Sequence, residues 1–369
     1  MKIIYDHQIF SRQEYGGISR YFHEISRRIP QLRGDVVEVF APFHVNGYLS
    51  TANSSLSKRI RCVKFPGSTL AFGITNVVAG KLFVRRRKDV AIFHETYYSA
   101  IDYAPAPAKR IITVYDMIHE LFPESFSAAD LTRRNKQRAV SRADHVICIS
   151  ECTRQDVVRL MGIPIEKTSV VYLGYSLIEG HGNEVFVPKI RNPFLLYVGK
   201  REGYKNFKCL LSAYGQSEEL KREFILVCFG GGRLTHSELS LMKSFGLTAA
   251  NVVCISGGDT VLAGLYSSAA ALIYPSLYEG FGIPPLEAMA RGCPVICTNT
   301  SSLPEVVGNA AIFFDPRSHN DLRAVIERVV GSGTISRNLI AIGYERVKNF
   351  SWDKCALDTL LEYNRILES

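Results

Sequence analysis

The sequence predicts an α/β protein built from two doubly wound domains that face a central cleft, with a helix at the C-terminal end. Its 369 residues exceed the size at which a single hydrophobic core usually keeps growing. Short β-branched and aromatic runs alternate with amphipathic stretches, a pattern typical of βα units around parallel sheets. The alternation occurs in two series, separated by a polar segment at 180–192. We therefore expect domains at 1–182 and 183–350, and a helix at 351–369 whose candidate packing partner is the first domain.

The expected strands are runs of β-branched, aliphatic and aromatic residues. In the first series they lie at Lys2–Tyr5, Val36–Ala41, Val90–His94, Arg110–Tyr115, His145–Ile149 and Ser169–Tyr172. In the second series they lie at Phe194–Val198, Phe224–Phe229, Val252–Ile255, Ala271–Tyr274, Val295–Cys297 and Ala311–Phe314. Helical periodicity marks Ile18–Ile29, Ala128–Arg142, Thr153–Leu160 and Trp352–Leu367. Because ligands of doubly wound sheets bind at the carboxyl ends of the strands, functional residues are expected there.

Composition is that of an ordinary globular protein in a reducing compartment. Apolar residues make up 47% and charged residues 21% of the chain, which excludes a disordered protein. The nine cysteines are scattered, and their spacing fits neither a disulfide framework nor a zinc site, so that no metal and no cofactor are expected. The N-terminus reads directly into a strand without a signal segment, and no apolar stretch approaches the roughly 18–20 residues that span a bilayer. These observations predict a cytoplasmic protein.

The net charge of +9 is unevenly distributed. Residues 1–180 hold 25 Lys and Arg against 17 Asp and Glu, whereas residues 181–369 hold 19 against 18. One basic cluster, at 81–88, mixes apolar and basic residues as a helix on an anionic surface does, and a second, at 133–138, resembles a solvated helix face. This excess predicts contact of the first domain with the anionic inner face of the cytoplasmic membrane or with a phosphate-bearing acceptor; the alternative is solubility alone. Nucleic acid is not an expected partner, because exposed aromatic residues do not interleave the basic runs.

A glycine-rich turn follows the expected strand at Ala271–Tyr274 and opens a helix with two prolines, at 284 and 285. Glycines let the backbone approach a ligand, and the amides of a helix start favour an anion, so this turn is a candidate phosphate site. Glu279 and Glu287 flank the turn and can accept hydrogen bonds from vicinal hydroxyls of a sugar or ribose. The stretch therefore predicts a site where phosphate and sugar meet. The alternative for both carboxylates is a solvated position that the helix dipole favours.

These residues resemble the signature of the retaining glycosyltransferases with the GT-B fold, glycosyltransferase family 4, in which two glutamates are separated by seven residues as Glu279 and Glu287 are. Further motifs extend the resemblance over essentially the whole second half: Tyr197-Val-Gly199-Lys-Arg201 with Lys205-Asn206, Val227-Cys-Phe-Gly230, Pro275-Ser276, Ser302-Leu-Pro304-Glu305 and Phe350-Ser-Trp352. A series of motifs in the right order is more specific than any one of them. The resemblance implies two Rossmann-like domains, the second of which binds a nucleotide-sugar donor.

The resemblance also implies roles for the two carboxylates and the turn between them. Glu287 would bind the ribose hydroxyls of the nucleotide. Glu279 would act as a catalytic residue that holds a hydroxyl of the transferred sugar. The backbone amides of Gly280, Phe281 and Gly282 would assist it.

The same resemblance implies groups that contact the diphosphate. Arg201 and Lys205 would be catalytic residues that neutralise it, since the leaving diphosphate carries extra negative charge and needs fixed cations. Gly16 and Gly17 stand at the family's glycine pair, in the loop that approaches the donor phosphates; the alternative is a plain tight turn. The remaining candidate donor contacts are Gly199, Asn206, Ser276 and Leu286.

The first half departs from the family pattern at one position. Tyr115 and Asp116 stand where many members have His-Asp at the end of a strand. If that histidine orients sugar or acceptor, then Tyr115, His119 or His94 must supply the polar group. His94 ends an expected strand and is the candidate catalytic residue, while a structural histidine is the alternative for His94 and for His119.

The reaction that the resemblance implies is transfer of a hexose from a nucleoside diphosphate sugar to an acceptor hydroxyl with retention at the anomeric carbon. No well-placed nucleophile is evident, and the resemblance therefore implies departure of the diphosphate and attack by the acceptor on the same face, with the enzyme contributing positioning and electrostatic stabilisation. The segment at 115–123 is similar to transferases that build bacterial surface polysaccharides from GDP-mannose or related donors, which favours a glycan or lipid-linked glycan as acceptor. Two alternatives stay open: a nucleotide-sugar epimerase on the same fold, and a non-catalytic subunit that binds a nucleotide sugar or glycan.

Overall fold

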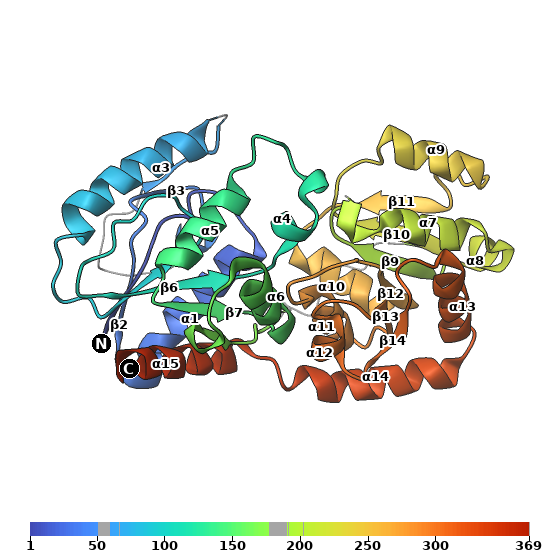
Figure 1. Ribbon diagram of the computed structural model, residues 1–369. Helices are drawn as coiled ribbons and strands as arrows, with labels where there is room; N and C mark the ends of the chain where they lie inside the picture. The colour runs from blue at the N-terminus through green and yellow to red at the C-terminus, as the bar shows by residue number, and fades with distance from the viewer. Residues whose placement is uncertain (51–59, 66, 177–189, 191, 202, 369) are drawn as a thin grey trace. The chain divides into compact units, whose positions relative to one another are not determined.

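The computed structural model describes residues 1–50, 60–65, 67–176, 190, 192–201 and 203–368 (Figure 1). The chain divides into two units: the first comprises Met1–Gly174 with Ser351–Ser369, and the second comprises Tyr175–Phe350. In the described part of the chain, each unit contains a six-stranded sheet whose strands all pair in parallel. Two parallel-sheet α/β units are the architecture that the alternation of strands and helices predicts. The expected boundary at 182/183 lies outside the described residues.

The sheet of the first unit has the order β2-β1-β5-β6-β7-β8. Its strands are β1 (Lys2–Tyr5), β2 (Val36–Val39), β5 (Ile92–Glu95), β6 (Lys109–Val114), β7 (His145–Cys148) and β8 (Thr168–Val170). All six expected strands are present, with ends shifted by a residue or two. A separate short pair, β3 (Phe43–His44) and β4 (Ile60–Arg61), was not expected. Four-residue strands such as β5 and β7 are buried along their whole length, as strands covered on both faces are.

The helices of the first unit are α1 (Gly17–Arg33), α2 (Gly47–Ser50), α3 (Ser68–Ala79), α4 (Ile118–Leu121), α5 (Thr132–Arg142), α6 (Glu151–Met161) and α15 (Trp352–Glu368). A π-helical turn, Gly80–Val84, continues α3. The terminal helix α15 packs along α1 (Figure 1), where the rings of Tyr21 and Trp352 lie 6.4 Å apart between centroids. A buried stripe on α15, which includes Trp352, Cys355, Thr359, Tyr363 and Ile366, explains why this helix joins the first unit although it ends the chain.

The basic cluster at 133–138 lies on α5, but it is not uniformly solvated. Lys136 is fully buried, and its ammonium donates to Glu120 Oε2 at 2.7 Å and to the Asp116 carbonyl oxygen at 2.8 Å. The expectation of a solvated face is therefore wrong for this lysine. Its position on the inward face of α5 and its carboxylate partner account for the burial.

The sheet of the second unit has the order β11-β10-β9-β12-β13-β14. Its strands are β9 (Phe194–Val198), β10 (Ile225–Phe229), β11 (Val252–Ile255), β12 (Ala271–Tyr274), β13 (Val295–Thr298) and β14 (Ala311–Phe314). Its helices are α7 (Phe207–Gly215), α8 (Glu218–Glu223), α9 (His236–Ser244), α10 (Asp259–Ser268), α11 (Ile283–Ala290), α12 (Leu303–Val307), α13 (His319–Val330) and α14 (Gly333–Val347). Serine or threonine side chains cap four of these helices by accepting a bond from a first-turn amide: Ser217, Thr235, Ser318 and Ser332.

In each sheet the strand order reverses at one place. The reversal lies between β1 and β5 in the first unit and between β9 and β12 in the second. Loops that leave the carboxyl ends of two such strands diverge to opposite faces and leave a crevice, where ligands of doubly wound sheets bind. The two reversal points therefore determine where the functional side chains of each unit are to be sought.

Among the described residues, no helix combines the length and the apolarity that crossing a membrane requires.

Candidate functional site

Two predicted motifs meet at the reversal point of the second sheet. The loop after β9 carries Gly199, Arg201 and Lys205, and the loop after β12 carries the turn at 275–282. A backbone hydrogen bond of 2.7 Å, from the amide of Leu277 to the carbonyl oxygen of Tyr204, joins the two loops. Residues that are about 75 positions apart in the sequence thus share one edge of the sheet, as the crossover connection of parallel strands requires.

Lys205 and Glu279 form an ion pair at this edge. The Lys205 ammonium donates to Glu279 Oε1 at 2.6 Å, and the two side chains are only 16% and 10% exposed. The ammonium also lies 5.3 Å from the ring centroid of Tyr204 and 5.7 Å from that of Tyr274. Burial, followed by the charge of Glu279, raises the pKa of Tyr274 well above its usual value, so its hydroxyl stays neutral beside the carboxylate. An anionic ligand that enters here meets a cation already held in place.

The backbone around Glu279 is fixed by two neighbouring serines. The Glu279 amide donates to Ser301 Oγ at 2.9 Å, and Ser302 Oγ contacts the carbonyl oxygens of Glu279 and Phe281 at 2.8 and 2.9 Å. Ser301 itself has a left-handed φ of 54°. The sequence placed Ser302 in a family motif without a role and did not identify Ser301. The only signal for either was the Ser-Ser pair directly before α12.

The glycine-rich turn leads into α11 through a conformation that needs glycine. Gly282 has a φ of 108°, and a Cβ atom there would lie 2.8 Å from Leu303 Cδ2. The side chain of Phe281 is buried, with its ring 5.7 Å from that of Phe350, so this residue can serve a ligand only through its backbone. Pro284 and Pro285 then start the helix. The turn thus offers main-chain amides at a helix start, as predicted for a phosphate site.

Glu287 lies on α11 with 9% of its surface exposed, and its Oε2 accepts a hydrogen bond of 3.2 Å from the Tyr266 hydroxyl on α10. Tyr266 was not among the predicted site residues. Leu286, the preceding residue and a predicted donor contact, is fully buried. Ser276 is also buried, and its carbonyl oxygen accepts a 2.7 Å bond from Thr298 Oγ1. Its place at the end of β12 fits a backbone role better than a side-chain one.

Arg201 does not have the environment that the prediction requires. Its side chain is 4% exposed; Nε donates to Glu238 at 2.9 Å, and the two terminal nitrogens donate to the carbonyl oxygens of four successive residues, Gly230 to Arg233, at 2.8–3.2 Å. Gly230, Gly231 and Gly232 all have left-handed φ angles, of 82°, 70° and 72°. The guanidinium therefore holds the backbone of the loop at 230–233 in its conformation. This geometry argues against direct neutralisation of a diphosphate by Arg201, since the carboxylate and carbonyl acceptors engage all but one of its five N–H donors.

Two smaller predictions in the loop after β9 have different outcomes. Gly199 has a φ of 128° and open space where a Cβ would stand, an arrangement compatible with close approach of a ligand. Asn206 also has a left-handed φ, of 54°, but its side-chain amide donates to the Pro316 carbonyl oxygen at 2.9 Å. Asn206 thus ties two loops together at the start of α7.

In the first unit, Gly16 and Gly17 lie at the start of α1, as predicted. A Cβ on Gly16 would lie 2.4 Å from Gln13 Oε1, so the glycine makes room for the Gln13 carboxamide. That carboxamide oxygen accepts a 3.2 Å bond from the Ser19 amide in the first turn of α1. Gly17 has open space on its Cβ side. The first turn of α1 is therefore covered in part by Gln13, a residue that the sequence did not single out.

The Tyr115-Asp116 pair and His119 lie on the loop that follows β6. Tyr115 is buried, and its hydroxyl donates to the Thr96 carbonyl oxygen at 3.2 Å. One oxygen of Asp116 accepts a 3.0 Å bond from the Ile118 amide. His119 stacks on Phe126 with ring centroids 3.9 Å apart, and burial lowers its pKa. Of these three side chains, that of Asp116 is the most exposed, at 28% against 18% for His119.

His94 is a core residue. It is fully buried at the carboxyl end of β5; Nδ1 lies 2.6 Å from the Tyr363 hydroxyl and Nε2 lies 2.9 Å from Thr113 Oγ1. Burial lowers its pKa to about 3, so the ring is neutral at physiological pH. A fully covered ring with both nitrogens bonded cannot touch a substrate, and this contradicts the catalytic role predicted for His94. The structural alternative describes it.

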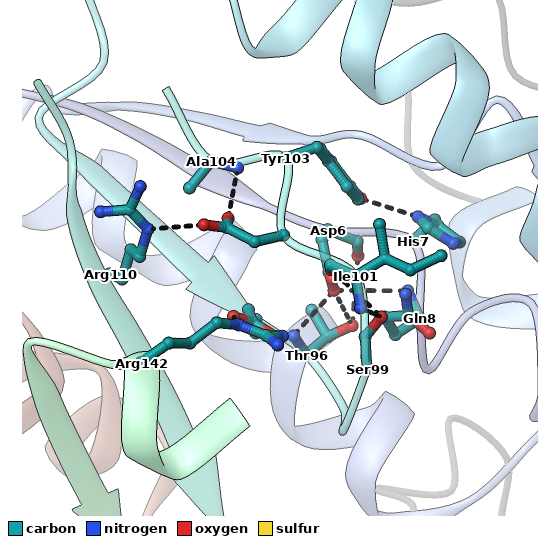
Figure 2. Close-up of polar contacts among 12 residues, drawn as sticks. Asp6, His7, Gln8, Thr96, Ser99, Ile101, Tyr103, Ala104, Arg110 and Arg142 are labelled. Atoms are coloured by element: carbon teal, nitrogen blue, oxygen red, sulfur yellow. Dashed lines mark hydrogen bonds and ion pairs between the residues drawn. The ribbon is translucent and has the colours of Figure 1, made fainter. Parts of the chain in front are cut away.

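The reversal point of the first sheet holds a polar cluster that the sequence analysis missed (Figure 2). Asp6, directly after β1, accepts bonds from the amide and the hydroxyl of Thr96, directly after β5, at 2.8 and 2.6 Å. Burial raises the pKa of Asp6 to about 6. Beside it, Glu95 pairs with Arg142. The signal available in the sequence was the position of three of these residues, because Asp6 and Thr96 directly follow apolar strands and Glu95 ends one.

Two family models match the chain. "Glycosyl transferases group 1" matches residues 184–346, and "Glycosyltransferase Family 4" matches residues 15–178. Each match covers most of one unit, so that the two in succession span most of the sequence.

Relatives and solved structures give the same picture. The O-antigen chain mannosyltransferase B of Escherichia coli is 26% identical over 374 residues, covering 94% of this chain and 95% of that protein. The serotype-specific mannosyltransferase WbdA of Escherichia coli is 29% identical over 293 residues, covering 74% of this chain but only 36% of that longer protein. The structure of sucrose-phosphate synthase from Thermosynechococcus elongatus shares the fold, with a TM-score of 0.72 at 19% identity over 100% of this chain and 99% of that one. The chain belongs to glycosyltransferase family 4 and is a glycosyltransferase with the GT-B fold.

Proposed function

We propose that this glycosyltransferase moves a hexose with retention of anomeric configuration, from a nucleoside diphosphate sugar to a glycan or lipid-linked glycan in the synthesis of a bacterial surface polysaccharide. GDP-mannose is the favoured donor, because two relatives that match the chain are named as mannosyltransferases. The observation that carries the proposal is the Lys205–Glu279 ion pair beside the Gly282 turn, at the reversal point of the second sheet.

Each group at this point has a defined task in the proposed donor complex. Glu287, held by Tyr266, accepts the ribose hydroxyls, and Glu279 accepts a hydroxyl of the sugar. The ammonium of Lys205 has three N–H donors, of which Glu279 engages one, so that others are available to the diphosphate oxygens. The amides at the start of α11 add positive potential. Arg201 supports the neighbouring loop.

In the proposed reaction the bond between the anomeric carbon and the diphosphate oxygen breaks while the acceptor hydroxyl attacks from the same face. The acceptor proton passes to an oxygen of the leaving phosphate, and the bonding electrons leave with the diphosphate, which gains negative charge. Lys205 and the helix start stabilise that charge. We propose that these fixed groups suffice without a divalent ion; turnover that is lost on addition of EDTA and restored by Mg²⁺ would contradict this.

Contact with an anionic membrane remains part of the proposal. The segment after α3 exposes Leu82 and Phe83, at 50% and 70%, next to the basic side chains of Lys81, Arg85 and Arg86. Apolar and basic side chains together favour an anionic lipid surface. The protein should sediment with anionic liposomes at low salt, and Phe83→Ser should reduce the bound fraction; equal sedimentation with neutral liposomes would contradict an electrostatic contact.

The experiment that tests the function has two stages. Thermal unfolding is first followed with UDP, GDP, ADP and their sugars, since a ligand at 100 times its Kd stabilises a protein by about 2.7 kcal/mol. The stabilising sugar nucleotide is then incubated with lipid-linked glycans, and the new linkage is analysed by NMR. We expect stabilisation by GDP and GDP-mannose and a product with the anomeric configuration of the donor. An inverted linkage, or conversion of the sugar without an acceptor as an epimerase would produce, refutes the proposal.

A further inference from the structure

Two cysteines of the second unit, Cys228 and Cys254, face each other across neighbouring strands. Cys228 lies on β10 and Cys254 on β11, which forms one edge of the sheet (Figure 1). They are register partners in a parallel pair, so both side chains leave the same face of the sheet. In the sequence they stand 26 positions apart, and it is the folded sheet that brings the two thiols together. None of the functions assigned so far uses them.

The two thiols differ in accessibility and in acidity. Cys254 is exposed, whereas Cys228 is fully buried in the core of the unit. The hydrogen bond that the Cys228 thiol donates, with a smaller contribution from the charge of Arg201, lowers the pKa of Cys254 to about 6. The same contact, followed by burial, raises the pKa of Cys228 well above its usual value. An exposed thiolate next to a buried thiol is the arrangement of an attacking and a resolving cysteine.

The surroundings of the pair favour thiol chemistry over metal binding. Structural zinc sites use more ligands than two thiols. In the described ranges of the chain, no group of three or more histidine, cysteine, aspartate or glutamate side chains is placed to hold a metal ion. Cys209, on α7 of the same unit, offers a contrast, because burial, followed by the charge of Asp315, raises its pKa to about 11 and keeps it a neutral thiol at physiological pH.

The spacing of the two strands permits a bond between the sulfurs but strains it. Neighbouring strands lie about 4.8 Å apart, and disulfides join residues whose Cα atoms are about 4.4–6.8 Å apart. The Cβ atoms of a disulfide, however, lie only about 3.8 Å from each other, so the bond would draw β10 and β11 together at this point. Strained and accessible disulfides are easily reduced, as bonds that form and break in a reducing compartment must be.

The strand ends next to the pair lead into loops of the donor side. The Phe229 carbonyl oxygen, at the end of β10, accepts a 3.0 Å bond from the Gly199 amide. The Gly230 amide donates to the Ile255 carbonyl oxygen, at the end of β11, at 3.0 Å. Phe229 and Ile255 directly follow the two cysteines. A change in the spacing of β10 and β11 therefore reaches the loop after β9, which contributes to the candidate donor site, and its neighbour at 230–233.

From these features we propose that Cys228 and Cys254 are a reversible oxidation site for hydrogen peroxide and related hydroperoxides, and that the disulfide weakens binding of the nucleotide-sugar donor. The oxidation site itself is independent of the transferase reaction. Its effect on the donor rests on the proposed function, for which it names a form of regulation.

The oxidation proceeds in two steps. The Cys254 thiolate attacks one oxygen of hydrogen peroxide, the O–O bond breaks and hydroxide leaves, so that Cys254 becomes a sulfenic acid. The hydroxide takes the proton of Cys228, whose thiolate attacks the sulfenic sulfur. The S–O bond breaks, and the second hydroxide that leaves takes up the proton that Cys254 released when it ionised. Two thiols are thus oxidised to one disulfide while one peroxide is reduced to two waters, and a dithiol reverses the bond by exchange.

The first experiment maps the bond. The reduced full-length protein is treated with hydrogen peroxide, free thiols are blocked with N-ethylmaleimide, and peptides are analysed by mass spectrometry without reduction. We expect a cross-linked peptide pair that contains Cys228 and Cys254, is lighter than the two reduced peptides by two hydrogens, and is lost after treatment with dithiothreitol. Absence of this cross-link, or cross-links spread over the other cysteines, overturns the proposal.

Variants separate a disulfide from a single reactive thiol. In Cys228→Ala, Cys254 lacks its partner and should gain oxygen atoms instead, up to the sulfinic acid, which dithiothreitol does not reverse. In Cys254→Ser, which changes the exposed member of the pair, Cys228 should stay reduced. Cys209→Ser is the matched control in the same unit and should form the cross-link as the wild type does. Oxidation of Cys228 in Cys254→Ser would show that Cys254 is not the attacking thiol and would overturn the proposal.

The effect on the donor is measured by calorimetry with GDP-mannose. Oxidation should raise the Kd of the wild type several-fold, dithiothreitol should restore it, and Cys254→Ser should bind equally before and after peroxide. An unchanged Kd in protein that carries the mapped cross-link overturns the proposed effect on the donor. If the reduced protein binds neither GDP-mannose nor another sugar nucleotide, the proposed transferase function fails, whereas the oxidation site is decided by the cross-link alone.

Discussion

The Lys205–Glu279 ion pair lends itself to a double-mutant cycle. Lys205→Met leaves the Glu279 carboxylate, 10% exposed, without the cation that lies 2.6 Å from it. Removing one partner of a buried ion pair typically lowers the free energy of unfolding by about 3–5 kcal/mol. Because both side chains here are partly exposed, we expect a smaller loss of about 2–3 kcal/mol. Glu279→Gln should cost less, because a lone lysine can extend its ammonium toward water. In the double variant no charge is left unpaired, so we expect the two changes to couple by about 2 kcal/mol.

The cycle requires a measurement that distinguishes the two units. Trp352 is the only tryptophan in the sequence and belongs to the first unit, so its fluorescence reports that unit, while far-UV circular dichroism reports both. Urea unfolding followed by circular dichroism gives the free energy of the transition that contains the second unit. Lys205→Met should also lower kcat about 100- to 1000-fold, because it removes a fixed charge from the leaving diphosphate. A coupling energy near zero together with an unchanged kcat would refute both the pair and its role.

Three further predictions concern other residues. Arg201→Ala should lower the free energy of unfolding of the second unit by about 2–3 kcal/mol and raise the donor KM more than it lowers kcat, since the guanidinium holds the loop at 230–233. A loss in kcat alone would instead indicate direct contact of Arg201 with the diphosphate. Burial lowers the pKa of His94 to about 3, against 6.5 for an exposed histidine, so between these pH values the unfolded chain binds one more proton than the folded protein does. The free energy of unfolding therefore falls as the pH drops, by about 1.4 kcal/mol per pH unit. His94→Gln should make this pH dependence less steep in acid denaturation, and an unaltered pH dependence would mean that His94 is charged in the folded protein. Gly282→Ala should destabilise the protein by about 1–3 kcal/mol in thermal unfolding, because of the φ of 108° and the contact of the new Cβ with Leu303. Gly17→Ala should change the stability little, because a Cβ there has open space. Similar losses of stability in both variants would contradict the explanation by backbone angle and Cβ contact.

Much of the fold follows from local sequence. The strands Phe194–Val198, Val252–Ile255, Ala271–Tyr274 and Ala311–Phe314 have the ends that the sequence predicts, because each is an apolar run bounded by polar or small residues. The helix expected at Ala128–Arg142 instead begins at Thr132, since the Asp130 carboxylate accepts a 2.7 Å bond from the Thr132 amide and forms a turn before it. The burial of Lys136 was not predictable in the same way. Arginines stand close to it in the sequence, at 133, 134 and 138, and its hydrogen-bond acceptors on Asp116 and Glu120 lie 20 and 16 positions away.

In the candidate site too, features set by local sequence were predictable, and contacts between distant residues were not. Residue types and spacing singled out Glu279, Glu287 and Lys205 as donor contacts, because a glycine-rich turn between a strand and a helix is a local feature, and their contact with a donor stays a prediction. The environment of Arg201 was not predictable for a physical reason: four of its acceptors are backbone carbonyl oxygens, which carry no side-chain signature in the sequence. The misassignment of His94 has another, since its partner Tyr363 lies 269 positions away, on the terminal helix. Contacts of either kind appear only once the chain has folded.

The engagement of Arg201 changes how the proposed site must stabilise the leaving diphosphate. Of the two cations predicted for that task, Lys205 keeps more N–H donors for a ligand, and Lys205 is bonded to the carboxylate that would hold the sugar. A displacement of the Lys205 or the Glu279 side chain would therefore disturb both the sugar and the leaving group. Glu279 would thus affect the reaction although it forms no covalent bond with the substrate. Glu287 is held by Tyr266, apart from this pair, and would contact the ribose, whose hydroxyls do not change charge in the reaction. Binding that is equal in ground and transition states affects KM rather than kcat, so in the proposed complex Glu287 would affect the donor KM and Glu279 would affect kcat.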